Sequence, residues 1–158
     1  MNKRSLAREY AFKFVYKHLM PEFTEEKKQL LADGAKREEA FRVFDHSYLE
    51  LDSEHPDNKI DMASKKFAQD LIIGSLTQEK INTAKIIPHL SNSNFDKVDK
   101  MNLAVLLLGV YEILNDPETS HGVFINEYVN IAKKYCPNES QGFINSILDK
   151  IAKENGKH

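Results

Sequence analysis

The stretch Leu103-Ala-Val-Leu-Leu-Leu-Gly-Val-Tyr111 decides the fold, because it is the longest unbroken apolar run in the chain. As a helix it is apolar on every side, and such a helix is buried at the centre of a protein. Its nine residues span only about 14 Å as a helix, whereas a membrane-spanning helix needs about 20 apolar residues. The stretch therefore predicts a buried central helix over residues 98–115, which Asn115-Asp-Pro117 ends.

The segments on both sides of this helix have the periodicity of amphipathic helices. Helices are predicted over residues 3–20, 24–52 (two, broken near Gly34), 59–90 (one long helix or two that abut), 120–135 and 139–154. The residues expected to face the core are Ala7, Ala11, Phe14, Val15, His18, Phe41, Phe44, Tyr48, Leu51, Phe67, Leu71, Ile72, Leu76, Ile81, Ile86, Val123, Phe124, Tyr128, Ile131, Ala132, Phe143, Ile144, Ile147, Leu148 and Ile151. In the first helix, Glu9, Lys13, Tyr16 and Lys17 fall on the opposite side. The prediction is an all-α, compact bundle of about seven helices that forms one domain over residues 1–158.

Composition supports a globular chain that acts inside the cell. The 158 residues are 41% hydrophobic and 29% charged, and the few glycines (6) and prolines (5) disfavour a β-sandwich or barrel. The start, MNKRSLAREY, lacks the apolar segment of a secretion signal. The single cysteine, Cys136, can form neither an internal disulfide nor a zinc site alone. We therefore expect a soluble cytoplasmic protein with no membrane span.

The sequence carries no pattern that supports catalysis, a metal or a cofactor. There is no glycine-rich phosphate loop and no nucleophile elbow, and the six histidines are scattered over different predicted helices. Cys136 and His121 could form a nucleophile and a base, although a buried or incidental cysteine is the more common situation. We expect no catalytic residue, no metal site and no cofactor, which leaves binding as the function.

The charges are distributed unevenly along the chain. The net charge is −2, yet residues 1–17 hold five cations and one anion, so the rest of the chain is acidic. A basic end on an acidic body fits a local phosphate-binding site, and Lys3, Arg4 and Arg8 are its candidate residues. Tyr16 and Phe143 are candidates for stacking on unpaired bases. Helical spacing favours a core position for Phe143, whereas Tyr16 falls opposite the apolar face and fits either role.

Three segments together resemble the NusB family of bacterial transcription antitermination factors. They are Arg4-Ser-Leu-Ala-Arg-Glu-Tyr-Ala-Phe-Lys-Phe-Val-Tyr16; Phe95-Asp-Lys-Val98 with the helix from Leu103 to Glu112; and Val123-Phe-Ile-Asn-Glu127, Ile131-Ala-Lys133 and Ser140-x-x-Phe-Ile-Asn-x-x-Leu-Asp149. Their order and spacing are preserved over nearly the whole chain. The third segment is the most specific, because its polar positions do not follow from helical periodicity.

The resemblance implies an all-helical fold of two packed three-helix subdomains without catalytic residues. It also implies binding of boxA-type single-stranded RNA jointly with NusE, a small-subunit ribosomal protein, and entry into an antitermination complex on RNA polymerase during ribosomal RNA synthesis. The positions that match RNA-proximal residues of the family are Arg4, Arg8, Tyr16, His89, Glu139 and Phe143, and those of the NusE-facing surface are Asp96, Asp99 and Asn102. Asn126, Glu127 and Asn145 are expected to be structural, since polar groups between packed helices must be paired.

Departures from the family pattern predict weak RNA binding by the chain alone. Ser5, Leu6, Leu107 and Gly142 stand where relatives carry basic residues, and fewer cations give a shallower dependence on salt. One alternative is a NusB-like protein-interaction module without RNA binding, which replacement of Arg4 and Arg8 by alanine would distinguish. A second is an RNA-binding fragment of a ribosomal RNA methyltransferase, although 158 residues leave no room for the catalytic domain.

Overall fold

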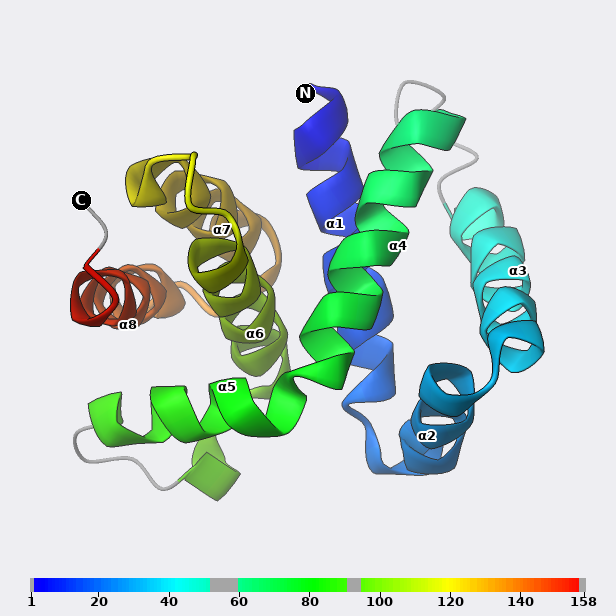
Figure 1. The fold of residues 1–158 in the computed structure, drawn as a ribbon, viewed down its shortest axis with the longest axis horizontal. Coiled ribbons are helices and arrows are strands. Elements are labelled where there is room, and N and C mark those ends of the chain that lie inside the picture. The colour runs from blue at the N-terminus through cyan, green and yellow to red at the C-terminus, as the bar shows by residue number, and fades with distance from the viewer. Residues whose placement is uncertain (1, 52–59, 91–94, 157–158) are drawn as a thin grey trace. The chain divides into compact units, whose positions relative to one another are not determined.

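The computed structural model of the chain describes residues 2–51, 60–90 and 95–156. These residues form helices and no strand (Figure 1). The α-helices are α1 (Lys3–His18), α2 (Thr24–Ala32), α3 (Gly34–Leu51), α4 (Met62–Thr77), α5 (Glu79–Ile86), α6 (Lys100–Asn115), α7 (His121–Tyr135) and α8 (Ser140–Glu154). Short 3₁₀ turns cover Pro21–Phe23, Ile87–His89 and Phe95–Lys97. The prediction of an all-α fold is confirmed, with one α-helix more than expected because residues 59–90 form two.

Contacts within the chain divide it into two compact units, Met1–Leu76 and Thr77–His158. No helix in the described part of the chain is long and apolar enough to cross a membrane. The boundary between the two units falls at the end of α4, next to the start of α5.

The first unit contains α1 to α4 and has an aromatic core. The rings of Tyr10 and Phe14 on α1 meet those of Phe41, Phe44 and Tyr48 on α3, with centroid distances between 5.0 and 5.2 Å for four of these pairs. Such edge-on and tilted pairs suit the charge distribution of aromatic rings.

The predicted break near Gly34 is confirmed, because α2 ends at Ala32 and α3 begins at Gly34. Asp33 caps α3 by accepting a hydrogen bond of 2.9 Å from the backbone N–H of Ala35.

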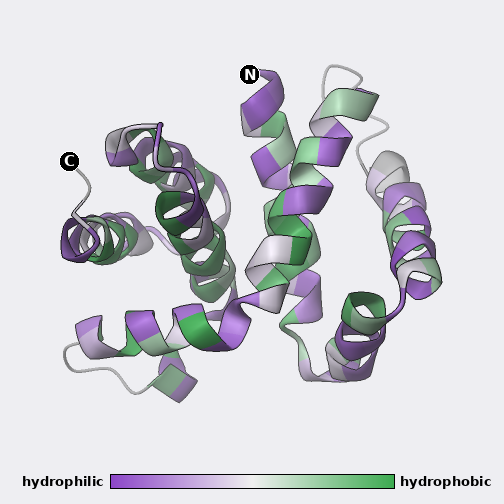
Figure 2. Ribbon diagram, viewed as in Figure 1, coloured by the Kyte–Doolittle hydropathy of each residue, from purple (hydrophilic) through white to green (hydrophobic). Residues whose placement is uncertain are grey.

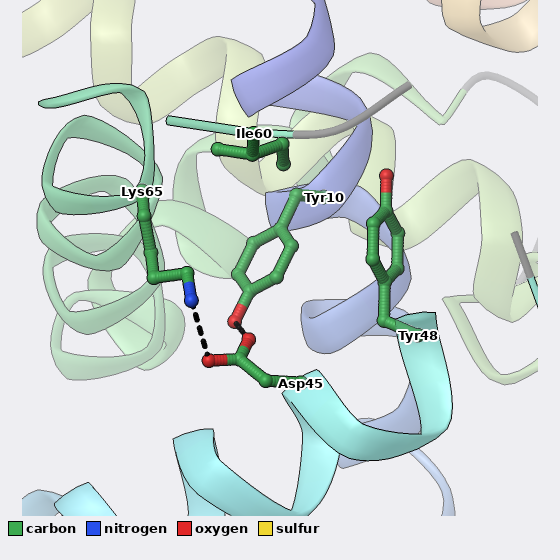
Figure 3. A pocket seen from close by; sticks show the side chains of 5 residues that line it. All are labelled: Tyr10, Asp45, Tyr48, Ile60 and Lys65. Carbon is green, nitrogen blue, oxygen red and sulfur yellow. Dashed lines mark hydrogen bonds and ion pairs between the residues drawn. The ribbon is translucent and has the colours of Figure 1, made fainter. Parts of the chain in front are cut away.

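A polar tie joins α1, α3 and α4 within this unit (Figure 3). The Tyr10 hydroxyl donates to Asp45 Oδ1, and Lys65 Nζ lies 2.9 Å from Asp45 Oδ2. Burial and the neighbouring Asp45 carboxylate raise the pKa of Tyr10 above its usual value of 10.0. The hydroxyl therefore stays protonated, and able to donate to the carboxylate, at pH values where an exposed tyrosine ionises.

The second unit is built around α6, which Figure 2 shows as hydrophobic along most of its length. Every residue from Leu103 to Val110 is buried, as the sequence predicts, and α7, α8 and α5 pack around this helix. Gly109 permits a close approach of α8, because a Cβ atom at this position would lie 2.9 Å from Leu148 Cδ1 on that helix. The buried Glu112 carboxylate accepts a hydrogen bond of 2.5 Å from the Tyr128 hydroxyl on α7.

Some predictions about individual side chains are wrong. Ile81 (62% exposed) and Val123 (49% exposed) face outward, because Asn82 and Ile86 turn inward on the short helix α5 and Phe124 centres the buried face of α7. Glu9 was expected on the outer side of α1, yet it is buried, because α1 is enclosed on nearly every side between Leu6 and Val15. The predicted core position Leu51 lies outside the residues whose side chains are described.

Candidate nucleic-acid interface

The first two turns of α1 carry the predicted cations, which lie against Phe67 on α4 and Asp61 directly before this helix. The Arg4 guanidinium carbon lies 3.9 Å from the centroid of the Phe67 ring, and that of Arg8 lies 5.4 Å from it. Lys3 Nζ forms an ion pair of 2.9 Å with Asp61 Oδ2. Arg4 is exposed, whereas Arg8 is only 6% exposed. The Arg8 side chain is therefore buried within the protein, with the Phe67 ring of α4 near its guanidinium group.

Asp61 precedes α4 and has two partners. Its Oδ1 accepts a hydrogen bond of 2.8 Å from the backbone N–H of Ser64, as an N-cap does. This bond and the Lys3 ammonium lower the pKa of Asp61 to about 2. The carboxylate is thus ionised and lies beside one of the predicted phosphate-binding cations.

The middle of α1 presents Tyr16, whose ring is half-buried. It stacks nearly parallel on Phe12, with centroids 6.3 Å apart and an interplanar angle of 12°. Lys13 Nζ and Lys17 Nζ each lie 4.9 Å from an aromatic ring, that of Tyr48 and that of Phe23 respectively. Tyr16 keeps part of its surface open to a base, while both lysines already contact aromatic groups.

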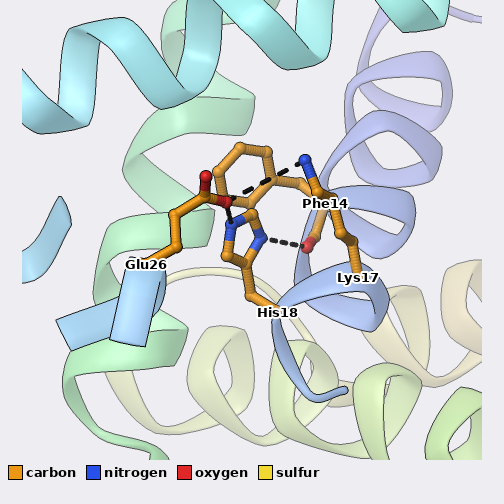
Figure 4. Close-up of polar contacts among 4 residues, drawn as sticks. All are labelled: Phe14, Lys17, His18 and Glu26. Atoms are coloured by element: carbon orange, nitrogen blue, oxygen red, sulfur yellow. Dashed lines mark hydrogen bonds and ion pairs between the residues drawn. The ribbon is translucent and has the colours of Figure 1, made fainter. Parts of the chain in front are cut away.

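His18, at the end of α1, joins this helix to α2 (Figure 4). Its buried ring stacks on Phe14, its Nδ1 lies 3.0 Å from the Phe14 carbonyl oxygen, and its Nε2 lies 2.5 Å from Glu26 Oε2. Burial lowers the pKa of His18, while the Phe14 carbonyl and the Glu26 carboxylate oppose this effect. Lys17 Nζ lies 3.9 Å from the same Glu26 oxygen. These contacts link α1 to α2, so the cluster has a structural role rather than a ligand-binding one.

A groove of about 420 Å³ along α2 and α3 is less suited to RNA. Its lining includes three carboxylates, those of Glu26, Asp33 and Glu39, and one ammonium, that of Lys36. Carboxylates repel phosphate groups, so the cationic start of α1 is the better candidate in this unit.

In the second unit, the predicted RNA-proximal residues lie on two elements. His89, in the 3₁₀ turn after α5, has a mostly buried side chain whose Nε2 lies 2.8 Å from Glu154 Oε1 on α8. Glu139 is exposed directly before α8, and Phe143 is half-buried on the first turn of that helix. Phe143, predicted as a core residue or a stacking group, is buried on one part of its surface and accessible on the rest.

The predicted partner-binding residues lie at the start of α6. Asp96 is exposed in the preceding 3₁₀ turn, and Asp99 is the N-cap, whose Oδ1 accepts bonds of 2.8 and 3.3 Å from Met101 N and Asn102 N. Asn102 Oδ1 is buried without a hydrogen-bond partner among the residues that the structure describes. The cap brings Asp99 and Asn102 together, while Asp96 lies in the turn before it.

The chemistry of Cys136 argues against the nucleophile considered above. Its thiol is buried, and burial together with the nearby Asp99 carboxylate raises its pKa to about 11. A thiol with a raised pKa is a poor nucleophile, because the thiolate is the reactive form. Within the described ranges, no group of three or more His, Cys, Asp or Glu side chains could hold a metal ion.

Residues 5–153 match the family model described as the NusB family. The chain belongs to the NusB family. It is 34% identical over 152 residues to the transcription antitermination protein NusB of Thermodesulfovibrio yellowstonii, covering 96% of this chain and 93% of that protein. It is also 34% identical over 119 residues to NusB of Fervidobacterium nodosum, covering 75% of this chain and 82% of that protein. The resemblance inferred from the three sequence segments is thereby confirmed.

Solved structures of NusB-family proteins share the fold. T. maritima NusB superimposes with a TM-score of 0.70 at 26% identity, over 97% of this chain and 92% of that one. A chain from a crystal structure of the antitermination factors NusB and NusE in complex with dsRNA gives a TM-score of 0.68 over 98% of both chains. That second chain is 22% identical, so this likeness concerns the fold.

Sequence reasoning missed two residues of the candidate interface, Phe67 and Asp61. The helical spacing of Arg4 and Arg8, four residues apart, indicates that they share a face, but nothing local shows that an aromatic ring on α4 covers this face. The NusB match begins at residue 5, so Lys3 and Arg4 precede it. Leu107, which stands where relatives carry a basic residue, is fully buried, so this departure concerns the core of the second unit.

Proposed function

We propose that this NusB-family chain is a non-enzymatic transcription antitermination factor that binds boxA-type single-stranded RNA together with NusE. The observation that carries the RNA-binding part is the cluster of Lys3, Arg4 and Arg8 on the first two turns of α1. Arginine donates several N–H groups in a fixed plane, which suits phosphate oxygens. In this proposal residues 1–158 act as one RNA-binding domain.

The unpaired bases would be recognised by groups other than these cations. Phosphate contacts give affinity with little choice of sequence, whereas aromatic faces and polar edges select bases in single strands. Tyr16 and Phe143 are half-buried and could stack on bases, and His89 and Glu139 supply polar groups. Each of these residues is proposed as an RNA contact on the basis of its position in the family pattern.

NusE is the proposed protein partner, and Asp96, Asp99 and Asn102 at the start of α6 are the proposed contacts. Support comes from the solved complex of NusB and NusE with RNA, which contains a chain of the same fold. The net charge of −2 predicts weak RNA binding by the chain alone, and a basic partner would strengthen it. The complete assembly would join RNA polymerase in the cytoplasm during ribosomal RNA synthesis.

One alternative has a specific observation in its favour. Arg8 is buried and Lys3 is paired with Asp61, which reduces the positive charge that RNA would meet. A NusB-like module that binds only protein would have these features.

Titration of a labelled boxA-like single strand tests the proposal, with and without NusE from the same source, at about 50 and 200 mM salt. We expect NusE to tighten binding and a scrambled strand to compete poorly. A duplex of the same sequence serves as a further competitor. Binding of NusE without RNA in any condition would favour the protein-interaction module and overturn the RNA site. Binding of neither would contradict both.

A further inference from the structure

Phe67 of α4 lies under two arginines that come from another helix. Arg4 and Arg8 are separated by one turn of α1, and their guanidinium carbons lie 3.9 and 5.4 Å from the centroid of this one ring. The sequence predicts Phe67 as a core residue, yet it is only half-buried, and Arg4 covers part of it. The ring therefore forms a platform for the arginine pair within the first unit.

Stacking on a ring occupies the flat face of a guanidinium and leaves the N–H groups at its edge directed along its plane. These edge groups are the ones that donate to phosphate oxygens. An arginine held on a ring also loses less conformational freedom on binding than one that moves freely. The stack is thus compatible with phosphate binding and prepares the side chain for it.

We propose that Phe67 is a positioning residue for RNA binding, which holds the exposed Arg4 so that its N–H edge meets the phosphate backbone, while the buried Arg8 lies near the same ring. The inference rests on the proposed function, because it names how the cations of that same site are oriented. Phe67 itself does not contact RNA in this account. Its effect passes through Arg4 above all, since Arg4 is exposed and lies nearer to the ring.

The test compares Phe67→Leu, which removes the ring, with Phe67→Tyr, which keeps it. In titrations of the single strand with NusE present, Phe67→Leu should weaken binding about three- to tenfold, and Phe67→Tyr should bind nearly as the unaltered chain does. The slope of log K against log salt should change little in Phe67→Leu, because no cation is removed. Met62→Ala, at an 89% exposed position of the same helix, is the matched control and should leave affinity unchanged.

A double-mutant cycle separates positioning from a general structural role. In an Arg4→Ala background, Phe67→Leu should weaken RNA binding much less than it does alone, because the stacked group is already missing. An equal loss in both backgrounds would overturn the inference. So would unchanged RNA binding by Phe67→Leu.

A second variant keeps the inference testable should Phe67→Leu fail to fold. Arg4→Lys keeps the charge at an exposed position and removes the planar group, so it should fold and weaken binding several-fold. Binding by Arg4→Lys as tight as that of the unaltered chain would contradict the role of the stack. If the unaltered chain binds RNA and these variants do too, the inference alone fails, whereas no RNA binding by the unaltered chain refutes the proposed function as well.

Discussion

α1 and α6 are both buried along most of their length, but the side chains that they bury differ in kind. In α6 the buried run from Leu103 to Val110 is entirely apolar and packs against α7 and α8. In α1, Arg8, Glu9 and His18 are buried, and Arg8 and His18 lie beside aromatic rings. The side chains that α6 buries are thus mostly apolar, with Glu112 near its C-terminal end as an exception, whereas α1 also encloses polar groups that need specific partners.

This difference predicts that substitutions in the two helices have different effects. Polar and charged groups inside a protein need partners at fixed positions, so they constrain geometry more than aliphatic groups do. α1, which buries these polar and charged groups, also carries the candidate RNA-binding cations. We therefore expect aliphatic substitutions in α6 to change stability most, and polar substitutions around α1 to change both stability and binding.

Leu107→Ala on α6 should have the largest effect on stability. Leu107 is fully buried, and truncation at such positions costs about 2–5 kcal/mol of the free energy of unfolding. Urea unfolding measures the loss. Ile81→Ala, at a position that is 62% exposed in the same unit, is the control and should change stability by less than about 0.5 kcal/mol. Similar losses for the two variants would break the comparison.

Asp45→Ala should have the next largest effect, in the first unit. The change leaves the Tyr10 hydroxyl without its acceptor and Lys65 without its ion pair, and an orphaned buried polar group costs about 1–3 kcal/mol. Tyr10→Phe removes the hydroxyl but leaves Asp45 paired with Lys65, so it should cost less. Chemical unfolding distinguishes the two variants, and an equal or larger loss in Tyr10→Phe would contradict the tie.

The pH dependence of stability is a second test of the buried Tyr10 hydroxyl and its hydrogen bond to Asp45. Folding raises the pKa of Tyr10 above its usual value of 10.0. The contribution of this group to the free energy of unfolding is therefore fully present below about pH 10 and is lost as the pH rises further. Unfolding free energies measured between pH 8 and 11 should therefore fall more steeply in the unaltered chain than in Tyr10→Phe, with ~pH 10 as the start of the difference. Parallel curves would show that the hydroxyl titrates alike in the folded and unfolded chain.

Asp61→Asn should have the smallest effect, and it concerns RNA. Asparagine still caps α4, but it no longer pairs with Lys3 or repels a phosphate. RNA affinity should rise by less than about threefold at low salt, and the gain should vanish at high salt. Anisotropy titrations measure it. Weaker RNA binding by Asp61→Asn, with the helix content unchanged, would argue that Lys3 does not meet RNA.

The sequence predicts α6 well, because an unbroken apolar run has one favourable environment and the neighbouring stripes follow helical spacing. It predicts α1 only partly. Ala7, Ala11 and Phe14 are buried as periodicity indicates, but the burial of Glu9 and Arg8 depends on tertiary partners. Phe67 and Asp61 lie more than fifty residues beyond the cations they hold, so no local pattern reveals these contacts. In the candidate interface, the sequence therefore predicts the cations but not the two residues that contact them.

The most direct test of the central claim, that the start of α1 binds RNA phosphates, is the salt dependence of RNA affinity in Arg4→Ala. Arg42→Ala is the matched control, since it removes the same charge from an exposed arginine on α3 that pairs with Glu39. The account predicts weaker binding of the single strand by Arg4→Ala and a slope of log K against log salt that is shallower by about 0.7. Arg42→Ala should keep the original slope. Equal affinities and slopes for Arg4→Ala and the unaltered chain would contradict the claim.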